Sequence, residues 1–323
     1  MYIFHIARPQ DVINKMIQNN LKLVDECLRS ARITDVLCAN SVIKYRESLK
    51  RFFKSVDGKS FDSLEMRDFD DYILKAKERG NSNSGILSAL YAVKWVMKKL
   101  QDQKLIKKRI DLEKINKPRV KKKDVNYLTK EEVSKVLGII ERELADGETI
   151  RKVRTMALYV LLLETGARIN EALSIKINDI DFENREIPII GKGNKPRTLF
   201  LHDGSVNWIK KYLNKRKDDN EFLFVTLNGK EQWVYNNVDR SFLRYRKMAN
   251  LYKDFTIHTF RHTFATQLLL NGVPINTVSY LLGHANLETT IKYYIGAIKK
   301  AEAKAQVLDK HFDFMPRSVL EPG

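Results

Sequence analysis

Two phrases near the end of the chain decide its fold and chemistry: HTFRHTFATQLL at residues 258–269 and LLGHANLETTIKYY at residues 281–294. In the first phrase His258 and Arg261 are three residues apart, a spacing that places both side chains on one face of a helix. In the second phrase His284 precedes Tyr293 by nine residues. Guanidinium, imidazole and phenol groups can bind a phosphate, move a proton and attack phosphorus, so the pattern indicates phosphodiester chemistry.

Two further phrases lie upstream and extend this chemistry. TGARINEAL (165–173) places Arg168 where one helix should end and another begin, and GKGNKPRTLFL (191–201) places Lys192 in a basic turn. Phosphodiester cleavage passes through a phosphorane with extra negative charge on its equatorial oxygens. Arg168 and Arg261, fixed on those oxygens, would stabilise the transition state more than the ground state. Lys192 would protonate the departing 5′ oxygen, and a plain phosphate-binding loop is the alternative.

These four phrases resemble those of the tyrosine recombinases, most closely the Xer and integrase branch. The resemblance is strong over about residues 126–296 and reaches the first part of the chain only by architecture. It selects Lys192 over Lys195 as the acid and Tyr293 over Tyr294 as the nucleophile, and it gives His284 a hydrogen bond to a nonbridging oxygen. His258 is the candidate base for the tyrosine proton. The implied catalytic set is Arg168, Lys192, His258, Arg261, His284 and Tyr293.

Two neighbouring residues are expected to support this set. Glu171, one turn after Arg168, is placed to hold an active-site side chain or to form a simple helix ion pair. His262 is expected to be a buried partner that supports the arginine helix, as its counterpart does in the family. His258 and His262 are four apart, but a metalloprotease motif needs Glu after the first histidine, and Thr259 stands there. Because Arg, His and Lys would do the electrostatic and proton work that a metal otherwise does, we expect no metal ion, no ATP and no other cofactor.

Composition favours a nucleic-acid partner. The 323 residues carry a formal net charge of +18, which attracts a polyanion, and DNA is favoured over an anionic membrane. The longest apolar run, Ala157 to Leu163, is far shorter than the roughly 20 residues of a membrane-spanning helix. With no signal-peptide pattern at the N-terminus, we expect a soluble, cytoplasmic protein. Cys27 and Cys38 are expected to be ordinary thiols.

A basic stretch and a helix signal divide the chain. Basic residues crowd into residues 98–123, and Thr129 with Glu132 forms a capping box that begins a new helix. We expect a helical core-binding domain at 1–115, a basic linker at 116–126, a catalytic domain at 127–315 and an unstructured tail at 316–323. A solvated tether is the alternative for the linker. The cations expected to contact DNA are Lys94, Lys98, Lys121, Lys122, Lys123, Lys195 and Arg197.

The expected fold is mainly α, a two-domain DNA clamp of the DNA breaking-rejoining type. A helical bundle precedes a mostly helical catalytic domain that carries a small antiparallel sheet. Alternating residues over 177–190 and 191–201 predict the sheet, and residues 222–225 suggest one further short strand. In the first domain the helical spacing of apolar residues predicts a packed face made of Ile86, Leu90, Val93, Met97 and Leu100.

The function implied by the resemblance is site-specific DNA recombination through a 3′-phosphotyrosyl intermediate, for integration, excision or chromosome dimer resolution. Type IB topoisomerase-like nicking and religation is an alternative, as is a non-catalytic DNA-binding protein. The tail predicts an amphipathic helix that docks on a neighbouring protomer, so that four subunits hold two duplexes, or that packs on its own domain. Its apolar seam is Ile298, Ala301, Ala305, Leu308 and Phe312. Whether an accessory protein takes part is left open.

Overall fold

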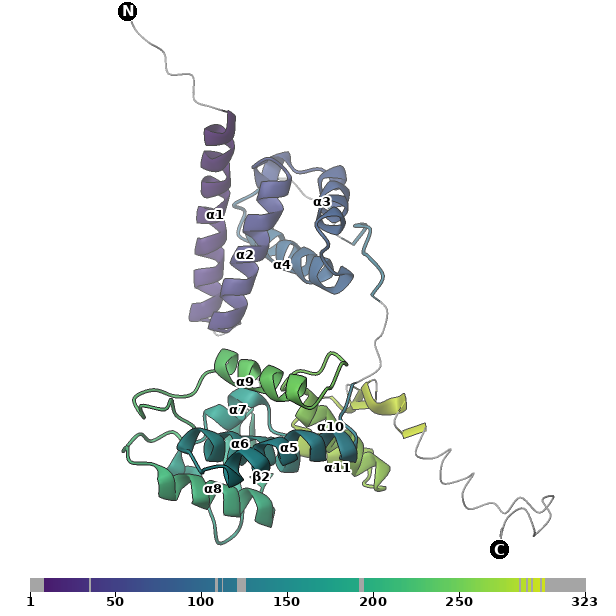
Figure 1. Cartoon of the computed structure of the whole chain (residues 1–323). Coiled ribbons are helices and arrows are strands. Elements are labelled where there is room, and N and C mark those ends of the chain that lie inside the picture. The colour runs from purple at the N-terminus through teal and green to yellow at the C-terminus, as the bar shows by residue number, and fades with distance from the viewer. Residues whose placement is uncertain are drawn as a thin grey trace, which may run out of the picture. The chain divides into compact units, whose positions relative to one another are not determined.

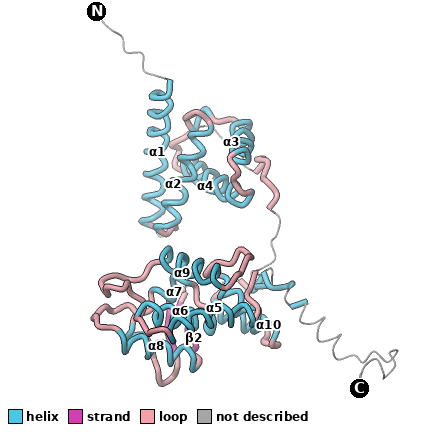
Figure 2. The backbone as a smooth tube through the Cα atoms, in the orientation of Figure 1, coloured by secondary structure: helices cyan, strands magenta, loops and turns pink. Residues whose placement is uncertain are grey.

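The computed structural model describes residues 9–34, 36–107, 110–111, 113–120, 126–191, 195–284, 286–288, 290–291, 293–296 and 298–299. The chain separates into two compact units, residues 1–122 and residues 123–323 (Figure 1). Helices predominate in both units, and the described strands belong to the second unit alone (Figure 2). The expected mainly α fold with a small antiparallel sheet is therefore confirmed.

The first unit is a helical bundle around an aromatic core. Phe52 lies against Phe69 and Tyr72, with ring centroids 5.2 and 5.3 Å away. The apolar face predicted on the last helix of this unit is buried throughout, whereas Lys98 on the same helix is exposed. That helix begins at Asn83, capped by the Ser82 side chain. The elements are α1 (Pro9–Ile33), α2 (Ala39–Ser55), η1 (Phe61–Ser63), α3 (Met66–Glu78) and α4 (Asn83–Asp102).

The second unit is built around one central helix, α6, most of whose residues are buried. It packs against α5, α7, α8 and α10. The predicted capping box is present, because Thr129 accepts from the Glu132 amide and Glu132 accepts from the Thr129 amide at the start of α5. The elements are α5 (Lys130–Ala145), α6 (Ile150–Thr165), α7 (Ile169–Leu173), η2 (Ile177–Asp179), β1 (Glu186–Ile190), β2 (Pro196–Phe200), α8 (Asp203–Lys215), α9 (Tyr235–Met248), α10 (Thr259–Leu270) and α11 (Ile275–Leu282).

The sheet is a two-stranded antiparallel hairpin in which Glu186 pairs with Phe200 and Ile190 with Pro196. It is shorter than the alternation over 177–201 predicted, because residues 177–179 form a 3₁₀ turn. The strand suggested at 222–225 is reduced to two isolated bridges, Lys176 with Phe222 and Val225 with Gln232. Ile187 and Leu199 face the core from the two strands.

A second, smaller core joins α10 and α11 to the helical residues that follow them (Figure 1). Ala265, Leu269, Val278 and Leu282 pack there, and Tyr294 fills the same cluster. The seam predicted along the tail has only Ile298 within the described residues, where it packs on this cluster.

Cys27 is buried and Cys38 is exposed, and both are free thiols. Across the ranges that the structure describes, helices long and apolar enough to cross a membrane are absent.

Candidate active site

The C-terminal end of α6 positions Arg168. The helix ends at Gly166, whose φ of +61° is a left-handed conformation that glycine adopts without strain. A side chain at Gly166 would also meet the ring of Phe264, 2.3 Å from the new Cβ. The chain then turns, and Arg168 directly precedes α7, as the TGARINEAL phrase predicted.

Arg261 is held inside the protein beside this turn. Its side chain comes from α10, and the residue is only 8% exposed. Nη1 donates to the Gly166 carbonyl at 2.8 Å, and Nη2 donates to the Leu282 carbonyl. Burial, followed by the charges of Arg168 and Arg197, lowers the pKa of Arg261 to about 9, so the guanidinium stays protonated at neutral pH. The two carbonyls fix its direction before any ligand binds.

Glu171 is the buried carboxylate that connects two arginines. Arg168 Nη1 donates to Glu171 Oε1 at 2.7 Å, and Arg197 Nη2 donates to Glu171 Oε2 at 2.7 Å. Burial opposes ionisation of Glu171, but the charge of Arg197 and the hydrogen bonds from Arg168 and Arg197 outweigh it and lower the pKa. Glu171 therefore holds an active-site arginine, and the pair is more than a simple helix ion pair.

Arg197 was expected to contact DNA, but its side chain is buried inside the protein. Its side chain is 6% exposed, and beyond Glu171 its Nη1 donates to the Leu281 carbonyl. Gly283 has a φ of +60°, and a Cβ there would lie 2.6 Å from Arg197 Cδ. Arg197 is thus packed under the loop that carries His284, where Nη1 and Nη2 are bonded to protein groups and the buried Nε has no partner among the described residues.

The three histidines have separate surroundings. His284 Nδ1 pairs with Thr290 Oγ1 at 2.6 Å, which leaves Nε2 for a ligand. His262 Nδ1 pairs with Tyr294 Oη at 2.8 Å, so it is a hydrogen-bonded support. His258, directly before α10, stacks on Tyr235 with ring centroids 5.8 Å apart. Burial and then the neighbouring arginines lower the pKa of His284 to about 4, and burial with Arg261 and His258 lowers that of His262 to about 4.

The two adjacent tyrosines are distinguished by burial. Tyr294 is 2% exposed, bonded to His262, and burial raises its pKa to about 12. Tyr293 is 55% exposed. A nucleophile needs access to its substrate, which Tyr293 has and Tyr294 lacks. Because His262 follows Arg261 directly, the Tyr294–His262 bond also anchors the tyrosine segment to the arginine helix.

The remaining expected site residues are lysines. Lys192, Lys121, Lys122 and Lys123 lie outside the described residues. Lys195 is exposed and lines a cavity of about 200 Å³ with Arg197, Tyr280 and His284. In the first unit Lys94 forms an ion pair with Glu113, whereas Lys98 is exposed beside it. Where the structure describes side chains, it contains no group of three or more His, Cys, Asp or Glu residues suited to a metal ion.

Sequence reasoning missed three partners that the structure supplies: Arg197 for Glu171, Tyr294 for His262, and Thr290 for His284. A local signal for Arg197 was Gly283, the residue before His284, because a glycine can mark the close approach of another group. Together these contacts place the guanidiniums of Arg168 and Arg261, the His284 imidazole and the exposed Tyr293 phenol in one structural unit.

The chain matches the phage integrase family over residues 126–300. A tyrosine recombinase of Thermosipho africanus is 31% identical over 261 residues, which are 79% of this chain and 88% of the relative. Tyrosine recombinase XerD of Staphylococcus haemolyticus is 26% identical, over 92% of this chain and 99% of its own length.

Two solved structures share the fold. The XerH site-specific recombinase, bound to a palindromic difH substrate in a post-cleavage complex, aligns with a TM-score of 0.73 and 21% identity, over 91% of this chain and 97% of that one. A lambda integrase dimer bound to a COC′ core site aligns with a TM-score of 0.62 and 16% identity, over 82% and 95%. At such identities the likeness shows the fold alone.

Proposed function

The chain belongs to the phage integrase family as a tyrosine recombinase, and on that premise we propose that it exchanges DNA strands at a specific site through a phosphotyrosine at Tyr293. The observation that carries this proposal is the difference between two adjacent tyrosines. Tyr294 is buried and hydrogen-bonded to His262, the residue after Arg261, whereas Tyr293 is exposed. The substrate is double-stranded DNA with a recombination site. Because that substrate is intracellular, the proposed enzyme acts in the cytoplasm.

Binding of the scissile phosphate is the first step. Arg168 and Arg261 bind the nonbridging oxygens, and His284 donates a hydrogen bond from Nε2. The protein carbonyls of Gly166 and Leu282 and the carboxylate of Glu171 already orient both guanidiniums. Such preorganised donors stabilise the charge that develops on phosphorus without reorganising during the reaction. The bound phosphate also counters the positive field that lowers the histidine pKa values.

Cleavage then exchanges one phosphorus–oxygen bond for another. Tyr293 Oη bonds to the 3′ phosphate while the bond to the 5′ oxygen breaks. His258 accepts the phenol proton, and Lys192 protonates the departing 5′ oxygen, so charge and protons balance. The burial and cationic neighbours that lower the pKa of His258 keep it unprotonated at neutral pH, as a base must be. A 5′ hydroxyl from a second duplex reverses these steps and completes exchange.

Exchange between two duplexes requires more than one subunit. The proposed assembly is a tetramer on two duplexes, linked by the C-terminal helix whose seam continues from Ile298 toward Phe312. Residues beyond 299 lie outside the described part, so sequence periodicity is the support for this step. A monomeric enzyme that only nicks and reseals one duplex is the alternative, and a reaction with two labelled duplexes distinguishes them.

The test is a denaturing gel of the full chain after incubation with a pool of nicked duplexes. Each duplex carries two inverted half-sites, and the sequence of the half-sites is randomised across the pool. A slowly migrating covalent adduct is expected for the wild type and Tyr294→Phe, and none for Tyr293→Phe. EDTA should not change its yield. An adduct that persists in Tyr293→Phe would refute the assignment of the nucleophile, and its absence from every variant would favour a non-catalytic DNA-binding protein.

A further inference from the structure

A second group of arginines surrounds a pocket of about 580 Å³ near the other end of α6. Arg151 and Arg154 come from the first turns of α6, and Arg240 and Arg244 come from α9. The loop of residues 226–233 closes a third side. None of these arginines belongs to the cleavage site described above.

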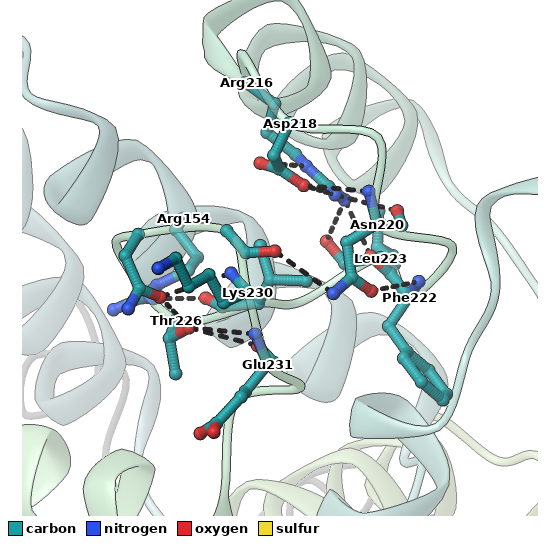
Figure 3. Close-up of polar contacts among 12 residues, drawn as sticks. Arg154, Arg216, Asp218, Asn220, Phe222, Leu223, Thr226, Lys230 and Glu231 are labelled. Carbon is teal, nitrogen blue, oxygen red and sulfur yellow. Dashed lines mark hydrogen bonds and ion pairs between the residues drawn. The ribbon is translucent and has the colours of Figure 1, made fainter.

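Arg154 lies at the buried part of this pocket. The residue is 5% exposed, and its guanidinium carbon lies 3.8 Å from the ring centre of Trp233. Nη1 donates to the Val225 carbonyl, and Figure 3 shows Arg154 beside the loop that carries Thr226, Lys230 and Glu231. Nε is buried and has no hydrogen-bond partner among the described residues. A buried donor without a partner is costly, and among the described arginines Arg154 Nε shares this state with Arg197 Nε.

The positive charge of the pocket is mostly unbalanced. Glu143 pairs with Arg244. Within the described ranges, no carboxylate forms an ion pair with Arg151, Arg154 or Arg240. The first turn of α6 contains no acidic residue, although the positive end of the helix dipole favours one there. Helix end and arginines together therefore attract an anion.

The loop that forms the third side is preformed. Arg216 donates to the Phe222 carbonyl at 2.6 Å, and Asn220 donates to the Gly229 carbonyl at 3.1 Å. Thr226 is bonded to Glu231 across the turn, with the backbone amide of Thr226 donating to the Glu231 carbonyl at 2.8 Å (Figure 3). These contacts hold the loop against Arg154 without a ligand, so binding requires little ordering of the protein.

We propose that this pocket, lined by Arg151, Arg154 and Arg240, binds a backbone phosphate of the DNA outside the cleavage site. The inference rests on the proposed function for its choice of DNA. Arg154 precedes Gly166 by twelve residues on α6, which is about 18 Å at the rise of a helix.

The experiment measures the salt dependence of duplex binding by the full chain in a Tyr293→Phe background, where no adduct forms. Each phosphate contact contributes about 0.9 to the slope of log K against log salt. Arg151→Ala and Arg240→Ala should each lower the magnitude of the slope, and the double variant should lower it by about 0.9, the contribution of one phosphate. Lys217→Ala is the matched control, because Lys217 is an exposed cation of the same unit outside the pocket.

The controls separate the possible failures. Arg151 and Arg240 are exposed, and thermal melting verifies that their variants fold. If the background protein does not bind duplex DNA at low salt, the proposed function fails and this proposal fails with it. If it binds but the double variant keeps the parental slope, or changes it no more than Lys217→Ala does, the pocket alone is refuted. Melting in inorganic phosphate and in chloride at equal ionic strength tests a free anion. A pocket-dependent stabilisation by phosphate with an unchanged DNA slope also refutes the proposal.

Discussion

Similar numbers of arginines lie near the two ends of α6, but their charges are neutralised differently. At the C-terminal end Arg168 and Arg197 share the buried carboxylate of Glu171, and main-chain carbonyls fix Arg261. At the N-terminal end Arg154 is equally buried but stacks on Trp233 and has no carboxylate partner among the described residues.

This difference matches the proposed roles of the two groups, catalysis at one end and phosphate binding at the other. A transition state gains most from donors that are already oriented, which is what the carboxylate and carbonyls accomplish around Arg168 and Arg261. A group that contacts a ground-state phosphate needs only positive charge and access. The N-terminal pocket has both, because Arg151 and Arg240 line it and are exposed.

The largest effect that separates the two ends is on the chemical step. Arg261→Ala should lower the single-turnover rate of adduct formation by about 10²–10³-fold, because it removes a preorganised donor to the phosphorane. Rapid-quench measurements at saturating DNA measure this rate. Lys217→Ala, which lies outside both arginine groups, should react at the wild-type rate. Equal rates for wild type and Arg261→Ala would contradict the role of the C-terminal group.

The next effect is on stability. Glu171→Ala leaves Arg197 buried without its carboxylate and should lower the free energy of unfolding of the second unit by about 3–5 kcal/mol. Glu143→Ala, at the other end, breaks a pair whose Arg244 side chain is 49% exposed and the hydrogen bond from Tyr245 Oη, and should cost about 2 kcal/mol. Urea unfolding in a Trp95→Phe background measures this, since Trp208 and Trp233 then report on the second unit alone. Equal losses would contradict the contrast.

A further effect concerns acid. The folded-state pKa values of His262 and His284 are about 4, below the ordinary 6.5, so the unfolded chain takes up protons first. Their contribution is complete above pH 6.5 and is lost as the pH falls toward 4, up to roughly 3 kcal/mol for His262 and less for His284, whose more solvated ring is screened by water. Unfolding free energies between pH 7 and about 5 should fall less steeply for His262→Gln than for wild type. Parallel curves would show that His262 is not responsible.

The sequence predicted those features whose signals are local. The phrase around Gly166 and Arg168 predicted a turn between helices, because a left-handed glycine ends one helix and the next begins three residues later, at Ile169. The Thr129 capping box and the apolar spacing of α4 were equally local, and both are confirmed.

Partners brought together by tertiary packing were not predictable in this way. Arg197 meets Glu171 across 26 residues, and Tyr294 meets His262 across 32. In the printed sequence Arg197 is one more cation of a basic hairpin, and only its burial shows that it serves the protein interior. The strand length also failed, because alternation over 177–185 cannot reveal that residues 177–179 form a 3₁₀ turn.

The smallest effect tests the contrast most sensitively. Arg154→Met should change the free energy of unfolding without DNA by less than about 1 kcal/mol. Losing the bond to Val225 and the Trp233 contact is offset by relief of the burial that lowers the Arg154 pKa to about 10. Arg197→Met should cost about 3 kcal/mol or more, because it leaves Glu171 with one partner fewer. Urea unfolding of both variants in the Trp95→Phe background makes the comparison. A loss for Arg154→Met as large as that for Arg197→Met would mean that Arg154 is already satisfied by the protein, and the distinction between the two ends of α6 would no longer hold.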